Sequence, residues 1–262
     1  MSGWRRPPGG RPLIMGILNA TPDSFSDGGM YEDVGAAARR AFEMEDEGAD
    51  VIDVGGESTR PGASPVSAED EIRRVAPVIR EIAGSLSVPV SIDTMKARVA
   101  EAAIAAGASA INDMGGLSDP AMAPLAASSG AHLVVAHMHG SPRTLATDLM
   151  GGGALGEVRS FLRGRADLAL ASGVRADRLV MDPGVGFGKT HAQSMEIVMS
   201  AGSFSMGFPV LIGPSRKRFL SHAFPGMGAD EATAEAAALA ASSGADMVRV
   251  HDVAGVRRAL ER

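Results

Sequence analysis

The sequence contains no cysteine, no excess of positive charge and no long apolar run. Without cysteine there are no disulfides, thiolate metal sites or cysteine nucleophiles, so any chemistry falls to His, Asp, Glu, Lys, Ser and Thr. A net charge of −6 argues against general nucleic-acid binding. No stretch approaches the roughly 18 consecutive apolar residues of a membrane span, and residues 4–10 lack the apolar core of a signal peptide. We therefore expect a soluble, cytoplasmic protein that binds neither nucleic acid nor membrane.

Glycine marks a repeat along the chain. Several helix-like segments end in Gly-Ala and a polar residue, and an apolar run then follows. A glycine just past the last turn of a helix adopts the left-handed conformation at no steric cost, and a short loop then enters a strand. Each copy therefore marks a helix that runs into a strand. The copies begin at Gly48, Gly107, Gly130 and Gly244, with a looser copy at Gly173.

The remaining apolar runs complete a set of eight strands that alternate with helical patterns. A spacing of about thirty residues over roughly 250 residues predicts an α/β fold, a single-domain (β/α)8 TIM barrel over residues 12–262. Residues 1–11 are expected to form a disordered tail. A doubly wound open sheet is the alternative. The predicted strands are Leu13–Leu18, Val51–Val54, Val88–Ile92, Ala110–Ile111, His132–Ala136, Leu179–Met181, Pro209–Ile212 and Met247–Val250.

All eight predicted strands are followed by polar groups that can bind or react. In a barrel these groups meet at one face, where the active site lies. Cationic side chains gathered there imply an anionic substrate group such as phosphate or pyrophosphate. Carboxylates and an amide imply a neutral heterocycle that presents ring N–H and amino donors. The cationic groups are Arg60, Lys217, Arg249 and His251, and the others are Asp93, Asn112 and Asp182.

Three motifs are typical of functional sites. The surrounding sequence argues against a phosphate loop in the first and a metal site in the second, and it leaves two interpretations of the third. The run DPGVGFGK ends at Lys189, but only three residues separate Gly184 from its Gly-Lys pair, where a Walker phosphate loop needs four. Its glycines are better interpreted as a close backbone approach to a ligand, with Phe187 as an aromatic surface. His137 and His139 have the spacing of a metal pair but no acidic partner, which favours packing and hydrogen bonding. The long loop that starts at Asn19 is either a series of turns or a functional cover.

Taken together, these strings resemble the dihydropteroate synthase family from Leu13 to Val253. The sharpest matches are NATPDSFSDGG and GGESTRPGA, and the others are SIDT, ND, HMHGSP, DPGVGFGK, SRK and RVHDV, in chain order. The resemblance implies a TIM barrel that condenses 6-hydroxymethyl-7,8-dihydropterin diphosphate with 4-aminobenzoate, with the assistance of Mg²⁺. It also implies a homodimer. The products are 7,8-dihydropteroate and pyrophosphate, and the diphosphate is expected to leave before the aryl amine attacks.

The resemblance also assigns roles to residues at matching positions. It implies catalytic roles for Arg60, Lys217, Arg249 and His251. It implies contacts with the pterin diphosphate for Asn19, Thr59, Asp93, Asn112, Asp182, Lys217, Arg249 and His251, with Asn19 also meeting Mg²⁺. It implies contacts with 4-aminobenzoate for Phe25, Thr59, Arg60, Pro61, Phe187 and Lys217.

The chain departs from the family pattern at two places. Ala136 stands where the family often has Met on the pterin floor, and Gln193-Ser194 stands where it often has His-Asn. The first departure leaves open a different pterin or aryl amine. Two other classes remain as alternatives: a corrinoid methyltransferase that uses a methyltetrahydropterin, and a non-catalytic pterin-binding paralogue. The two longest matching loops argue against the former, and the intact leaving-group residues argue against the latter.

Overall fold

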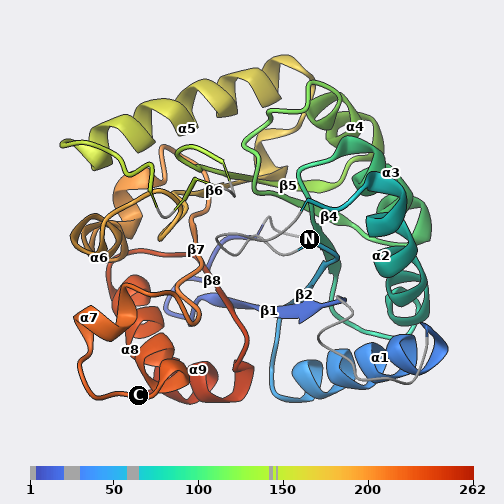
Figure 1. The fold of residues 1–262 in the computed structure, drawn as a ribbon, viewed down its shortest axis with the longest axis horizontal. Coiled ribbons are helices and arrows are strands. Elements are labelled where there is room, and N and C mark those ends of the chain that lie inside the picture. The colour runs from blue at the N-terminus through green and yellow to red at the C-terminus, as the bar shows by residue number, and fades with distance from the viewer. Residues whose placement is uncertain (1–3, 21–29, 58–64, 142–143, 146) are drawn as a thin grey trace.

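The computed structural model describes residues 4–20, 30–57, 65–141, 144–145 and 147–262. Eight parallel strands form the wall of a barrel, and helices surround it (Figure 1). The strands are β1 (Leu13–Asn19), β2 (Val51–Gly55), β3 (Val90–Asp93), β4 (Ala110–Asp113), β5 (His132–Ala136), β6 (Leu179–Asp182), β7 (Leu211–Ile212) and β8 (Met247–Val250).

The barrel closes between its sixth and seventh strands. Hydrogen-bonded neighbours run in the order β6-β5-β4-β3-β2-β1-β8-β7. Met181 of β6 then forms a parallel bridge with Val210, next to β7, and its amide donates to the carbonyl oxygen of Pro209 at 2.8 Å. This closure confirms the predicted barrel and excludes the doubly wound open sheet.

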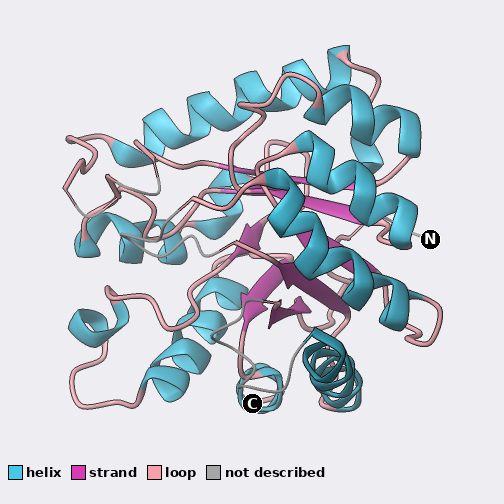
Figure 2. Ribbon diagram, turned by 45° about the vertical axis from the view of Figure 1, so that its right-hand side comes forward, coloured by secondary structure: helices cyan, strands magenta, loops and turns pink. Residues whose placement is uncertain are grey.

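Each strand is followed by one α-helix that lies outside the barrel, except that two helices, α7 and α8, follow β7 (Figure 2). The short α7 and two 3-10 helices were not predicted, because each is too short to show an apolar period. No helix in the described ranges is long and apolar enough to cross a membrane. The α-helices are α1 (Met30–Asp46), α2 (Ala68–Ala83), α3 (Ala97–Ala106), α4 (Met122–Ser129), α5 (Ala154–Ala171), α6 (His191–Met199), α7 (Leu220–Ala223), α8 (Ala229–Ser242) and α9 (Val253–Leu260).

The glycine repeat marks the helix ends as predicted. All five glycines have a positive φ, where a β-carbon would be strained. After the turn each chain enters the next strand within a few residues. The φ values are 99° at Gly48, 120° at Gly107, 68° at Gly130, 96° at Gly173 and 97° at Gly244.

Two apolar layers hold the barrel together. The larger one packs the outward side chains of the strands against the helices. The smaller one fills the inside of the barrel, and its members come from seven of the strands. These are Met15, Val51, Ala110, Val134, Val180, Leu211 and Met247, with Trp4 beside them.

Strand periodicity places the polar groups directly above this inner layer. Side chains two residues apart point to the same side of a strand. Val51 is therefore followed on the inside by Asp53, Val180 by Asp182, and Met247 by Arg249. On the inward-facing side of these strands, the side chains near the start are apolar, and those near the end are the polar groups of the candidate site.

The N-terminal segment differs from the predicted disordered tail. Trp4 is only 8% exposed, and its indole stacks on the imidazole of His132 with centroids 4.6 Å apart. The amide of Arg6 donates to Asp246 at 3.0 Å, and its guanidinium donates to the carbonyl oxygen of Ala241 at 2.9 Å. Composition alone suggested disorder because the proline and glycine residues that follow Trp4 obscure its one apolar anchor.

We predict that this contact makes the protein sensitive to acid. Burial, with the charge of Arg178, lowers the pKa of His132 to about 4 from an ordinary 6.5. Protonation therefore favours the unfolded chain, so the free energy of unfolding falls as the pH drops from 6.5 to 4, by at most about 3 kcal/mol. Urea unfolding followed by the fluorescence of Trp4 measures this, since Trp4 is the only tryptophan.

The matched variant is His132→Phe, which keeps an aromatic ring against Trp4 but cannot titrate. Its free energy of unfolding should depend less on pH over this range than that of the wild type. An unchanged dependence would assign the acid sensitivity to other groups.

Candidate active site

Arg249 is the centre of the polar layer. Its Nε donates to Oδ2 of Asp53 at 2.6 Å, and its Nη2 donates to Oδ2 of Asp93 at 2.6 Å. The same oxygen of Asp53 accepts from Nδ2 of Asn112 at 2.9 Å. Three of the residues predicted to hold the pterin are thus joined through Asp53.

Burial and charge act in opposite directions in this cluster. Burial raises the pKa of Asp93 to about 7, even though Arg249 lowers it. Burial opposes the charge of Arg249, but the carboxylates of Asp53 and Asp93 raise its pKa above the ordinary value. Arg249 therefore stays charged. Hydrogen-bond donors of a ligand can compete with Arg249 for the carboxylate of Asp93.

Asp182 and Lys217 face the same opening from β6 and from the loop after β7. Burial raises the pKa of Asp182 and lowers that of Lys217 to about 8. Oδ1 of Asp182 accepts from the amide of Gly184 at 2.7 Å. Nζ of Lys217 donates to the carbonyl oxygen of Val185 at 2.6 Å and lies 4.1 Å from the ring centroid of Phe187. Phe187 and Lys217, both predicted to contact 4-aminobenzoate, thus lie next to each other.

The glycine loop between β6 and α6 packs against the end of β5. Gly184 and Gly188 have φ values of 66° and 65°. A β-carbon at Gly184 would overlap the carbonyl oxygen of His137, and one at Gly188 would overlap that of His139. The glycines therefore serve close backbone packing against β5 as well as the approach to a ligand.

A pocket of about 220 Å³ opens beside β1, and both Asn19 and His251 line it. The hydroxyl oxygen of Ser215 lies 2.8 Å from Nδ1 of His251 and accepts from the His251 amide at 3.1 Å. When the hydroxyl also donates to Nδ1, the neutral imidazole carries its proton on Nε2. The other lining residues are Ile17, Leu18, Arg40, Met44 and Arg216.

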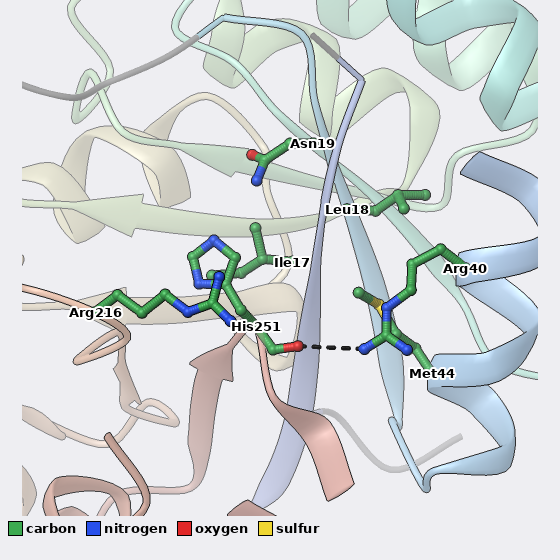
Figure 3. Close-up of a pocket in the computed structure, with 7 residues that line it drawn as sticks. All are labelled: Ile17, Leu18, Asn19, Arg40, Met44, Arg216 and His251. Carbon is green, nitrogen blue, oxygen red and sulfur yellow. Dashed lines mark hydrogen bonds between the residues drawn. The ribbon is translucent and has the colours of Figure 1, made fainter. Parts of the chain in front are cut away.

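Two arginines in this pocket were not predicted as site residues. Arg216 extends toward His251 in Figure 3, and its guanidinium forms a fork with Asp230 at 2.7 and 3.0 Å. Arg40 reaches from α1, donates to Glu47 at 2.7 Å, and lies 3.5 Å from the carbonyl oxygen of His251. Arg40 carries no sequence signal, because only the fold brings a helix residue to a strand end.

Several predicted site residues lie outside the described ranges. These are Phe25 of the first long loop and Thr59, Arg60 and Pro61 of the second. Around the second loop, Glu57 and Glu71 each accept from Nζ of Lys96 at 2.6 Å. Among the described residues, no group of three or more His, Asp or Glu side chains is arranged to hold a metal ion.

Comparison with known proteins identifies the family. The model of the pterin-binding enzyme family matches residues 15–251. The dihydropteroate synthase of Bacillus subtilis is 44% identical over 252 residues, which are 95% of this chain and 86% of the relative. The chain belongs to the dihydropteroate synthase family.

Solved structures of dihydropteroate synthases have the same fold. The enzyme of Xanthomonas albilineans with 4-aminobenzoic acid has a TM-score of 0.88 and 40% identity, over 96% of this chain and 91% of that one. The enzyme of Anaplasma phagocytophilum with bound 6-hydroxymethylpterin-monophosphate has a TM-score of 0.87 and 41% identity, over 95% and 97%.

No role was predicted for Asp53 of β2, although it lies in the polar cluster. It is completely buried, and its Oδ2 accepts from both Asn112 and Arg249. The available signal was its place two residues after Val51, which puts both side chains inside the barrel.

We predict that Asp53→Ala lowers the free energy of unfolding by about 3 kcal/mol, because a buried guanidinium loses one of its two carboxylates. Urea unfolding measures the change. The control is Asp177→Ala, which removes the acceptor of an exposed Arg175–Asp177 pair with contacts of 2.9 and 2.7 Å. That variant should stay within about 0.5 kcal/mol of the wild type. Equal losses in both variants would contradict the central role of Asp53.

Proposed function

We propose that the chain condenses 6-hydroxymethyl-7,8-dihydropterin diphosphate with 4-aminobenzoate, giving 7,8-dihydropteroate and pyrophosphate in folate biosynthesis. The observation that carries the proposal is that two different sets of polar groups lie next to each other at one end of the barrel. The carboxylates of Asp93 and Asp182 are buried above the inner apolar layer, where they interact with the charges of Arg249 and Lys217, while His251 and Asn19 line a neighbouring pocket. The ligands in the two related structures, an aminobenzoic acid and a pterin phosphate, correspond to the two substrates.

The pterin end is recognised by hydrogen-bond complementarity. Carboxylates of Asp93 and Asp182 accept from the ring N–H and amino groups, Asn112 can both donate and accept, and Lys217 donates to the ring acceptors. Ala136 is completely buried at the end of β5. The family often has methionine at this position, and we propose that the smaller side chain allows a different pterin.

The diphosphate end is held by Arg249, His251 and Asn19. The bond between C9 of the pterin and the diphosphate oxygen breaks, and the electron pair leaves with the diphosphate. The amine nitrogen then bonds to C9 and releases a proton. Fixed positive charge stabilises the charge that develops on the leaving group. No covalent nucleophile is needed, which agrees with a chain that has no cysteine.

We assign the Mg²⁺ contact to Asn19. Its amide supplies the oxygen that Mg²⁺ prefers, and Asn19 lines the same pocket as His251. Mg²⁺ commonly takes one or two protein groups and completes its shell with phosphate oxygens and water, so one amide suffices. When bound, the ion neutralises charge on the diphosphate.

The deciding experiment measures pyrophosphate release by the purified protein with Mg²⁺ and the pterin diphosphate, with and without 4-aminobenzoate. We expect release that requires the amine and that falls when EDTA removes the metal. Added Mg²⁺ should restore it. Release that ignores the amine, or no release, would refute the synthase activity, and release that persists in EDTA would refute only the metal assignment.

The control variant is Asp182→Asn, which keeps the shape of the side chain but turns one acceptor oxygen into a donor group. Pterin binding, measured by calorimetry without the amine, should weaken. Unchanged affinity would show that Asp182 does not contact the pterin.

We also propose a homodimer, in a cytoplasmic protein. Two apolar side chains on neighbouring helices support the dimer: Met199 of α6 is 61% exposed and Leu239 of α8 is 36% exposed. Most alanines of α8 pack against the barrel instead, among them Ala232, Ala236 and Ala240.

Light scattering in solution tests the dimer. The wild type should have twice the chain mass of 26.8 kDa, and Met199→Asp should shift it toward the monomer, because a charge would be buried in the interface. Leu168→Asp on α5, whose leucine is 43% exposed, should leave the mass unchanged. A monomeric wild type would refute the proposal.

A further inference from the structure

Lysine is rare in this protein and occurs only at the catalytic face. Of 25 basic residues only three are lysines, at positions 96, 189 and 217. Lys217 belongs to the proposed site, and Lys96 joins Glu57 to Glu71. Lys189, the last residue of the glycine motif, has no role in the mechanism above. Arginine is the usual cationic residue in this chain. Lysine at these positions indicates that a compact ammonium group is needed where the planar guanidinium of arginine does not fit.

Lys189 is buried and uses its ammonium group completely. It is 6% exposed, and Nζ donates to the carbonyl oxygens of Gly184 at 2.8 Å and Phe187 at 3.2 Å. The third acceptor is Nδ1 of His137 at 2.8 Å. Burial and the charge of Lys189 lower the pKa of His137 to about 3, so its ring is neutral and can accept. The carbonyl oxygen of His137 also accepts from Nζ, at 3.5 Å. Burial lowers the pKa of Lys189 itself to about 7, and in its charged form the three N–H donors are all used by these acceptors.

These contacts join two segments. Gly184 and Phe187 are the ends of a turn in the glycine loop, and the amide of Phe187 also donates to the carbonyl oxygen of Gly184 at 3.2 Å. His137 follows β5 and is itself held by the ring of Phe161, edge to face at 4.8 Å. Lys189 therefore fixes the turn to the neighbouring strand end.

The turn fixed in this way carries the two groups that position Lys217. Val185 lies inside the turn, and its carbonyl oxygen accepts from Nζ of Lys217 at 2.6 Å. Phe187, at the end of the turn, places its ring 4.1 Å from the same nitrogen. Both contacts named for Lys217 thus come from residues of the turn that Lys189 holds.

We infer that Lys189 is a positioning residue. Its buried ammonium holds the turn from Gly184 to Phe187 against His137, and this turn positions Lys217 in the substrate site. Lys189 touches no substrate in this arrangement. It acts through the carbonyl oxygen of Val185 and the ring of Phe187.

The small number of lysines allows a direct test by NMR of protein labelled at the lysine side chains. Three sets of signals are expected, and Lys217→Met assigns one of them. The methylene protons of Lys217 next to Nζ should lie upfield, because they sit over the face of Phe187. In Lys189→Met this signal should move downfield, while that of Lys96, which contacts Glu57 and Glu71, stays in place.

The matched control is Gln193→Met. Gln193 caps α6 just after the loop and donates to the carbonyl oxygen of Gly151 at 2.6 Å, but it does not contact the turn. It should leave the Lys217 signal unmoved. If Lys189→Met fails to fold, as judged by circular dichroism, Lys189→Gln is measured instead. Its shorter side chain has only two N–H donors and no charge and cannot reach all the acceptors of Lys189, so the Lys217 signal should again move. A folded variant with an unmoved Lys217 signal would overturn the inference.

The effect on turnover rests on the proposed function, whereas the NMR result does not. In Lys189→Met, kcat/KM should fall on the order of tenfold, the effect of one lost hydrogen bond to a charged group, mainly through a higher KM for the pterin diphosphate. Gln193→Met should retain the wild-type value. A moved Lys217 signal in a wild-type protein that lacks synthase activity would support the positioning role and refute the activity. A moved signal with unchanged kcat/KM would refute the link between Lys217 and the substrate.

Discussion

The structure of the site depends on one guanidinium held between two carboxylates inside the barrel, with the Arg249 side chain only 18% exposed. Arg249 comes from the last strand, and its two carboxylates come from the second and third, so the ion cluster spans 196 positions between Arg249 and Asp53. A buried charge is tolerated only when it is paired and hydrogen-bonded, which ties the geometry of these strands together. The cluster exists only if β8 pairs with β1, because β1 lies between β8 and β2.

The same constraint connects stability to function. Arg249 is held by Asp93, whose pKa burial raises to about 7, and the pterin is proposed to bind this carboxylate. The pterin and Arg249 therefore compete for the carboxylate of Asp93, while Asp53 remains hydrogen-bonded to Arg249. Around this cluster the protein uses a second anchoring strategy. Lys189 satisfies its ammonium with carbonyl oxygens and an imidazole, so backbone is held in place without another carboxylate.

Much of the fold could be predicted from local patterns. The Gly-Ala copies located helix ends correctly, and the strands His132–Ala136 and Met247–Val250 were predicted to the residue. At β7 and at the start of β3 the predicted strand was too long, because apolar residues continue past the hydrogen-bonded ladder. Five strands instead end later than predicted, because the ladder continues past the apolar run into a polar residue or glycine: β1, β2, β3, β4 and β6. Predictions failed where an isolated anchor decides the structure. Trp4 packs on His132 although its neighbours are typical of disorder, since one large aromatic side chain outweighs several turn residues.

The sequence by itself determined the barrel, the order of its polar strand ends and the family, because these follow from short-range periodicity and from motifs that are contiguous in the chain. Only the tertiary structure decided which of those groups pair. Asp53 became the acceptor shared by Asn112 and Arg249, Arg40 reached the pocket of His251, and Lys189 became the anchor of a turn. Each of these depends on distances between strands and helices far apart in the chain, which no local pattern encodes.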